Sequence, residues 1–226
     1  MRPRVVINVA MSLDGKLSTR ERKQVKISGK EDFERVDKLK AKSDAIMVGI
    51  GTVLADDPSL TIKSDELKHK RLEKGLEENP VRVVVDSAAR IPLTSSLLYK
   101  GKGRRVIAVS RRADPQKVIE LKKIVTVIEG GETEVDLARL LDELGAMGVH
   151  QLMVEGGGTL ISGLFAARLV DEIYTFIGNL IIGGKDAPTL ADGEGFVREN
   201  DFSRLTLLEA TQLGKGILLH WKVSPQ

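Results

Sequence analysis

The segment from Val149 to Gly163 carries the clearest chemical signal in the chain. Its letters, VHQLMVEGGGTLISG, describe an apolar strand that leads into an acid, three glycines, a threonine and then a helix. Glycines let a backbone approach phosphate oxygens, and the free N–H groups and dipole of a helix N-terminus attract an anion. The segment therefore predicts a diphosphate site and a nucleotide ligand. A tight turn without a ligand explains the same letters, and the GxGxxG pattern in its usual setting is not matched.

Two further segments end predicted strands with residues that suit a ligand. Met47–Ile62, MVGIGTVLADDPSLTI, places Gly-x-Gly-Thr and one helical turn ahead of an Asp-Asp-Pro sequence. We expect this segment and the glycine run to face each other across a cleft. An N-cap at Thr52 and a simple turn form the structural alternative. Val9–Leu17 ends in Asp14-Gly15, which is a turn signal first and a ligand site second.

The sequence offers little for metal or nucleophilic chemistry. The chain has no cysteine, which excludes disulfides, thiolate metal sites and a cysteine nucleophile. Its histidines, His69, His150 and His220, are scattered, and none lies in a zinc pattern or beside a GxSxG serine. We therefore expect no metal site and no catalytic histidine.

Short β-branched runs alternate with helical patterns along the chain. The predicted strands are Val5–Met11, Ala45–Gly49, Val81–Asp86, Arg105–Val109, Ile124–Ile128, Gln151–Val154, Glu172–Ile177, Leu205–Ala210 and Ile217–Val223. The predicted helices run from a Ser28–Glu31 capping box to Lys42, from Val135 to Gly145, and onward from the glycine run. This alternation predicts an α/β protein with a largely parallel sheet, to which the helix-free end after Tyr174 adds antiparallel strands. With 226 residues, 42% of them hydrophobic, we expect one domain over residues 1–226.

Two local predictions concern polar surfaces. In the first helix, Phe33, Val36 and Leu39 are predicted to form one apolar stripe with Lys40 on its basic edge. The charged segment Lys63–Pro80 has little periodic apolar content and is predicted to be a solvated excursion with at most a helical turn.

Charge and composition narrow the possible partners. Lys and Arg number 35 against 32 Asp and Glu, and the basic residues are spread among acids. With only 5 Phe, 1 Trp and 2 Tyr, the chain lacks the basic and aromatic surface of a nucleic-acid binder. The apolar run after Arg4 is interrupted by Asn8 and ends at Asp14-Gly15, too soon for a signal peptide. We therefore expect a cytoplasmic protein with neither nucleic acid nor membrane as partner.

Three segments, taken in order, resemble the pyrimidine reductases of riboflavin biosynthesis: VAMSLDG near the start, GTVLADDPSLT in the middle and VEGGGTL late in the chain. The likeness also covers PVRVVVDSAARIPL and LVDEIYTFIGNLIIGGKDAP, and so almost the whole chain. It implies a dihydrofolate-reductase-like three-layer fold with a mixed, mostly parallel central sheet flanked by helices. It also implies NADPH as cofactor, with NADH as the alternative, and a homodimer. Because no zinc-deaminase module precedes these motifs, the chain resembles the free-standing archaeal or fungal type.

The resemblance implies which residues bind the cofactor. Thr52 and Asp56 correspond to residues that contact the nicotinamide dinucleotide. Ser87 corresponds to a serine that meets the adenosine half, and Ala10 to a small residue beside the cofactor. The turn that would hold the diphosphate comprises Gly156, Gly157, Gly158, Thr159 and Leu160.

The 2′-phosphate of NADPH requires a further subsite. Our own candidates are Ser110, Arg111 and Arg112, because hydroxyl and guanidinium donors at a strand end suit a dianion. A solvated basic loop explains these three residues equally well.

The substrate side follows from the same resemblance. Glu155 matches the substrate-binding glutamate and Leu60 the leucine of DPxLT, while Lys40 and Lys63 stand where bacterial members have phosphate-binding arginines. Lysine provides a point charge, whereas the guanidinium of arginine can form two parallel hydrogen bonds to a phosphate. Lys40 could equally lie on the solvent-exposed edge of its helix. The implied reaction is hydride transfer from NADPH to C1′ of the ring-opened imine of a ribosylaminopyrimidine 5′-phosphate, giving the ribitylamino product. Asp56, Glu155 or a water molecule is the candidate proton donor.

Two other functions remain open at this point. A dihydrofolate-reductase-type pterin reductase would carry a tryptophan shortly after its first strand, whereas the only tryptophan here is Trp221. A non-catalytic NADPH-binding sensor would bind cofactor without turnover. For the homodimer, we expect a strand in the apolar stretch Ile173–Ile182 to extend a sheet across a two-fold axis.

Overall fold

The chain forms two compact units in the computed structural model, which describes residues 1–23 and 25–224. The predicted domain over 1–226 therefore includes Gln24 and the last two residues, which lie outside the described residues. The first unit comprises Met1–Pro3 and Asp37–Met153, and the second comprises Arg4–Val36 and Val154–Gln226.

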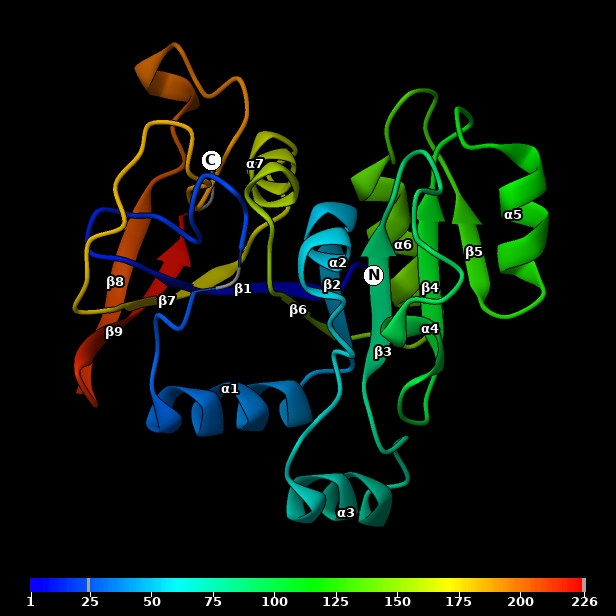
Figure 1. The fold of residues 1–226 in the computed structure, drawn as a ribbon, viewed down its shortest axis with the longest axis horizontal. Helices are drawn as coiled ribbons and strands as arrows, with labels where there is room; N and C mark the ends of the chain where they lie inside the picture. The colour runs from blue at the N-terminus through cyan, green and yellow to red at the C-terminus, as the bar shows by residue number, and fades with distance from the viewer. Residues whose placement is uncertain (24, 225–226) are drawn as a thin grey trace. The chain divides into compact units, whose positions relative to one another are not determined.

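The first unit is built on parallel strands in the order β5-β4-β3-β2-β6. The strands are β2 (Ala45–Gly49), β3 (Val81–Val85), β4 (Arg105–Val109), β5 (Thr126–Glu129) and β6 (Gln151–Val154). Figure 1 shows β3, β4 and β5 side by side with their arrows in one direction, as their parallel pairing requires. Strands buried on both faces read as continuous apolar runs, and Ile46, Val84 and Ile107 lie fully buried in the core of this unit.

Five helices lie within the first unit. They are α2 (Ile50–Asp56), α3 (Asp65–Glu73), α4 (Ser96–Tyr99), α5 (Pro115–Lys122) and α6 (Leu137–Ala146). Helix α6 buries Leu140, Leu141 and Leu144 as its spacing predicted. The short helix α4 and the helix α5, which Asp114 caps through the Gln116 N–H, were not predicted.

The second unit contains β1 (Arg4–Met11), β7 (Glu172–Ile177), β9 (Gly216–Val223) and β8 (Leu205–Leu213), in that order across its sheet. β1 and β7 are parallel, whereas β7–β9 and β8–β9 are antiparallel. Helix α7 (Gly158–Ala166) and the 3-10 helix η1 (Glu199–Asp201) belong to this unit, and α1 (Lys30–Lys42) begins in it and ends in the first. The predicted mixed, mostly parallel α/β fold of the dihydrofolate-reductase type is confirmed.

Two predictions about β7 and β8 were wrong. β7 pairs with β1 on one side and β9 on the other, so the strand at Glu172–Ile177 is an interior strand and cannot extend a sheet to another subunit. The edge strand of this unit is β8, which continues to Leu213, beyond the predicted end at Ala210.

The predicted apolar stripe of α1 was also wrong. Phe33 is 56% exposed, whereas Asp32 and Asp37 are buried. Asp32 pairs with Arg35, and the Asp37 carboxylate accepts hydrogen bonds from the N–H groups of Lys63 and Ser64, each at 2.8 Å. Val36 and Leu39 are only partly buried, so the fully buried side chains of α1 are polar, and Asp37 binds another segment by hydrogen bonds.

The charged segment after Lys63 was predicted as a solvated excursion, but residues Asp65–Glu73 form the nine-residue helix α3. Ser64 caps the helix by accepting the Leu67 N–H. The side chain of Arg71 is buried and donates to the carbonyls of Glu77, Ala41 and Ser43. Tertiary hydrogen bonds thus stabilise a helix whose apolar periodicity is weak.

No helix of the described part of the chain has the length and apolarity needed to cross a membrane.

Candidate functional site

Three predicted site residues of the first unit, Thr52, Asp56 and Ser87, follow the carboxyl ends of its parallel strands. Gly49, the last residue of β2, pairs with Val85, the last of β3, so the segments after both strands leave the sheet together. Helix α2, which carries Thr52 and Asp56, follows β2 directly, and Ser87 follows β3. Ligands of open α/β sheets bind at this carboxyl edge.

Asp56 and Asp57 at the end of α2 have opposite environments. Partial burial raises the pKa of Asp56. Hydrogen bonds from Ser95 Oγ at 2.6 Å and from the Ser96 N–H at 2.8 Å lower the pKa of Asp57 and place it at the start of α4. Neighbouring carboxyls whose environments separate their pKa values commonly divide into a proton-holding and a charged group. The pKa of Asp56 is thus raised although its side chain is exposed, and that of Asp57 is lowered.

The backbone after α2 is strained. Asp57 and Leu60 adopt left-handed φ values of 40° and 51°, which residues other than glycine rarely adopt. Such residues cluster at functional sites. Leu60, a predicted substrate contact, is only 4% exposed and packs in the core.

Lys63 lies in a cluster of cations and hydroxyls that also includes Lys40. The Lys63 Nζ donates to Ser59 Oγ at 3.2 Å and to Thr61 Oγ1 at 3.1 Å. Burial lowers the pKa of Lys63, and the neighbouring charges of Lys40 and Lys100 lower it further, with Asp37 acting in the opposite direction. Cations held together in this way attract an anion, and a phosphate would take both charge and hydrogen bonds.

Ser87 and Ser110 lie at the carboxyl edge, where they follow β3 and β4, whereas Ile62, next to Lys63, bonds to Asn79 just before β3. Ser110 Oγ is within hydrogen-bond distance of the carbonyls of Ser87 (2.8 Å) and Thr133 (3.1 Å), and Ser87 Oγ accepts the Val135 N–H at 3.2 Å. Because Ser110 is 1% exposed, its hydroxyl supports the loop rather than a ligand, contrary to our candidate role. Arg111 and Arg112 are exposed.

The second unit contains the glycine turn. Glu155 follows β6 and is partly buried, and Ala10 lies near the end of β1, opposite Phe176 of β7. Gly156 has a φ of 114°, and a Cβ placed there would meet nothing within 4 Å. Gly157, the N-cap residue of α7, has no side chain with which to cap the helix. Open space beside Gly156 and the absence of a side-chain cap at Gly157 fit a diphosphate.

A segment that the sequence did not single out packs against this turn. A Cβ on Gly158 would lie 2.6 Å from both Asp192 Oδ2 and the Thr189 carbonyl oxygen, so this position requires glycine. Asp192 Oδ1 accepts from the Thr189 N–H and hydroxyl, and the Asp192 N–H donates to the Gly158 carbonyl. The letters around Asp192 carry no pattern that would reveal this contact.

Asp14 is a second residue whose role emerges only in three dimensions. Its carboxylate accepts from Ser12 Oγ at 2.6 Å and from the N–H groups of Ile182 and Gly183 at 3.1 and 2.7 Å. These bonds lower its pKa to about 2. The predicted turn at Asp14-Gly15 therefore anchors the loop after β7.

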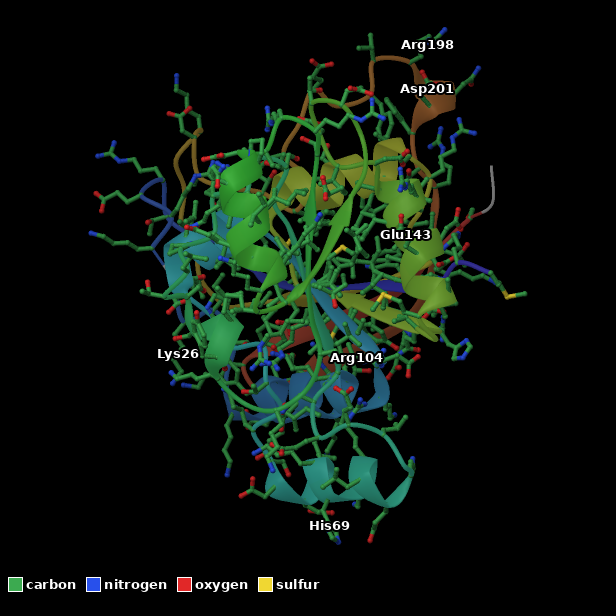
Figure 2. All side chains as sticks on the ribbon, turned by 90° about the vertical axis from the view of Figure 1, so that its right-hand side faces the viewer. Lys26, His69, Arg104, Glu143, Arg198 and Asp201 are labelled. Carbon is green, nitrogen blue, oxygen red and sulfur yellow. The ribbon has the colours of Figure 1, made fainter. Side chains whose placement is uncertain are left out.

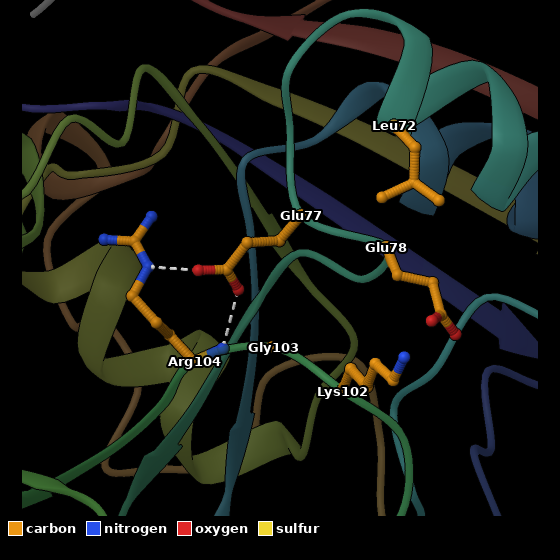
Figure 3. Close-up of a pocket in the computed structure, with 6 residues that line it drawn as sticks. All are labelled: Leu72, Glu77, Glu78, Lys102, Gly103 and Arg104. Atoms are coloured by element: carbon orange, nitrogen blue, oxygen red, sulfur yellow. Dashed lines mark hydrogen bonds and ion pairs between the residues drawn. The ribbon is translucent and has the colours of Figure 1, made fainter.

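A cavity and two of the histidines are further polar features of the described chain. A surface cavity of about 500 Å³ is lined by Leu72, Glu77, Glu78, Lys102, Gly103 and Arg104 (Figure 3). Glu77 accepts from the backbone N–H and the Nε of Arg104, so these charges neutralise each other. His69 points outward from α3 (Figure 2), and His220 pairs with Glu172 at 2.9 Å. No metal-binding group of His, Cys, Asp and Glu occurs among the described residues.

Comparison with known proteins gives one family. The RibD C-terminal domain model matches residues 3–219. The chain is 56% identical over 199 residues to the 2,5-diamino-6-ribosylamino-4(3H)-pyrimidinone 5′-phosphate reductase of Archaeoglobus fulgidus, covering 88% of this chain and 90% of that protein. It is 45% identical to the Methanothermobacter thermautotrophicus protein of the same name, covering 99% of each.

A solved structure agrees in fold. The crystal structure of a pyrimidine reductase-like protein from Corynebacterium diphtheriae superposes with a TM-score of 0.85 at 19% identity, covering 99% of this chain and 93% of that one. Family model, sequence identity and fold lead to one conclusion: the chain belongs to the RibD C-terminal domain family.

Proposed function

We propose that the chain reduces the ribosyl side chain of 2,5-diamino-6-ribosylamino-4(3H)-pyrimidinone 5′-phosphate to the ribitylamino product in riboflavin biosynthesis, with NADPH as reductant. The observation that carries the proposal is the 56% identity to the Archaeoglobus fulgidus reductase over 90% of that protein's length. The cation cluster around Lys63 supports it, because the substrate is a phosphate ester.

The residues present fit a nicotinamide dinucleotide. Gly156, Gly157, Gly158, Thr159 and Leu160 would hold the diphosphate, since Gly156 has open space beside it and no side chain caps the helix. Thr52, Asp56, Ser87 and Ala10 would contact the rest of the cofactor. NADPH is named on the family resemblance, and Arg111 and Arg112 would meet its 2′-phosphate. When bound, the cofactor supplies the hydride.

The protein's own residues have three tasks in this reaction. Lys63 and Lys40 bind the phosphate, which anchors the substrate while its ribosylamine opens to an imine at C1′. Glu155 and Leu60 bind the remainder of the substrate. Reduction of the C=N bond also consumes one proton at nitrogen, and Asp56 is suited to donate it because burial raises its pKa.

The proposal includes a cytoplasmic homodimer. The substrate and cofactor are charged metabolites, which is the reason for the cytoplasmic assignment. Strand β8 is the edge of its sheet, and Leu205, Leu207 and Leu208 along it are 42%, 48% and 49% exposed. An apolar edge strand of this kind is typical of an interface. We propose that β8 contacts a second copy of the chain.

Substrate-dependent oxidation of NADPH, followed at the absorbance of the reduced nicotinamide, tests the activity. We expect turnover by the wild type, and loss of turnover in Glu155→Gln but not in Glu194→Gln, a matched exposed acid. Gly158→Val should lose cofactor binding, because its side chain meets Asp192 and Thr189. Cofactor binding without turnover would favour a sensor, and turnover of a dihydropterin instead would favour a pterin reductase.

A further inference from the structure

Arg111 and Glu132 form an ion pair at the carboxyl edge of the first unit's strands. Arg111 follows β4 and Glu132 follows β5, and these two strands are parallel neighbours (Figure 1). Both side chains are 74% exposed, so a ligand in solution can reach either of them.

The backbone fixes this pairing. The Arg111 N–H donates to the Gly131 carbonyl at 3.0 Å, which places Arg111 beside the residue before Glu132. Gly131 has a φ of 88°, and a Cβ on it would collide with the carbonyl oxygen of Glu134. A glycine is required there, and the turn presents Glu132 to Arg111.

The same turn is tied to Ser87. Ser110 Oγ is within hydrogen-bond distance of the Ser87 and Thr133 carbonyls, and the Val135 N–H donates to Ser87 Oγ. Segment 131–135 therefore lies against the residue to which we assign the adenosine half of the cofactor. If Ser87 meets the adenosine half, the Arg111–Glu132 pair would lie next to the 2′-phosphate of NADPH, where NADH has a hydroxyl.

We infer that Glu132 is a specificity-determining residue that competes with the 2′-phosphate for Arg111 and so reduces the preference for NADPH over NADH. The inference rests on the proposed function. An exposed ion pair is weak, so a dianion can displace the carboxylate, but it must then overcome both the pairing and the repulsion of Glu132. NADH, which has no 2′-phosphate, leaves the pair in place.

The test uses cofactor binding, measured by the fluorescence of the reduced nicotinamide without substrate. In Glu132→Gln we expect the Kd for NADPH to fall about three- to tenfold, with the Kd for NADH changed less than about twofold. Glu134→Gln is the matched control: it removes the same charge from an exposed position in the same loop, and should leave the NADPH-to-NADH ratio within about twofold.

A second variant isolates the interaction with Arg111. Arg111→Gln should raise the Kd for NADPH about tenfold, and in that background Glu132→Gln should change the ratio much less, because only the repulsion between Glu132 and the 2′-phosphate is left to remove. An unchanged ratio in Glu132→Gln, an equal change in Glu134→Gln, or a full effect without Arg111 would each overturn the inference while leaving the reductase proposal intact. If the wild type bound neither cofactor, the proposed function itself would fail, and the inference with it.

Discussion

At the scale of single residues, Asp56 and Asp57 are consecutive, yet their surroundings move their carboxyl pKa values in opposite directions. Burial raises the pKa of Asp56, whereas hydrogen bonds from Ser95 and Ser96 lower that of Asp57. The letters DDP cannot distinguish them, because the difference comes from α4, about 40 residues later in the chain.

If Asp56 donates the proton, kcat should fall as pH rises through its raised pKa, since only the protonated carboxyl is an acid. Asp56→Asn should lower kcat about 100-fold or more and abolish this alkaline limb, as a pH profile at saturating substrate would reveal. Asp57→Asn is the control. It should change kcat much less, because asparagine tolerates the left-handed backbone and still accepts from Ser96. If kcat of Asp56→Asn still fell at high pH as in the wild type, another group would be the proton donor.

Lys63 provides a second prediction at this scale. Lys63→Gln should raise the KM for the phosphorylated substrate about tenfold, because a charge-assisted contact is lost, with little change in kcat. Steady-state kinetics with the dephosphorylated substrate should show no difference between wild type and variant. Lys70→Gln, which removes an exposed lysine of α3, should behave as wild type. A similar KM effect on both substrates would contradict a role in phosphate binding.

At the scale of elements, the loop after β7 is held through one carboxylate. Hydrogen bonds from Ser12, Ile182 and Gly183 lower the pKa of Asp14 to about 2, below its ordinary value of 3.8. Because the folded protein binds the proton more weakly, Asp14 stabilises the folded state above about pH 4 and ceases to do so as pH falls towards 2.

The difference in unfolding free energy between wild type and Asp14→Asn should therefore shrink from neutral pH to about pH 2. Denaturant unfolding at several pH values measures it. Ser12→Ala removes the strongest of these hydrogen bonds, so the pKa of Asp14, followed by NMR titration, should rise towards 3.8. A pKa near 3.8 in the wild type would show that the carboxylate does not bind the loop in solution.

At the scale of the whole molecule, the exposed leucines of β8 predict a dimer. Leu208→Glu should convert a particle of twice 24.7 kDa into one of 24.7 kDa in light scattering, because a buried carboxylate disfavours the interface. Ile119→Glu is the matched control, since Ile119 on α5 is 50% exposed against 49% for Leu208. A wild-type mass of 24.7 kDa would remove the dimer from the proposal.

The single domain over residues 1–226 remains a prediction. The boundaries between the two units fall within α1 and at β6 rather than in flexible linkers. We therefore expect one cooperative transition in differential scanning calorimetry, with equal calorimetric and van't Hoff enthalpies. Two resolved transitions would define two domains.

The sequence by itself determined the fold class, the family and most strands. Strands β2, β4, β6 and β7 begin and end where predicted, because each strand is a short apolar or β-branched run whose limits are visible in the letters. The glycine turn before α7 could also be predicted from the sequence, because few residues other than glycine can adopt its backbone conformation.

The tertiary structure decided the rest. Helix α3, the polar buried face of α1, the supporting role of Ser110 and the burial of Leu60 all depend on partners distant in sequence. Hydrogen bonds such as those from the backbone to Asp37 and from Arg71 to three carbonyls produce no repeating pattern of residues in the sequence, so they cannot be predicted from it. Local patterns report which face of an element is apolar, whereas the environment of a polar side chain is set by the chain that folds against it.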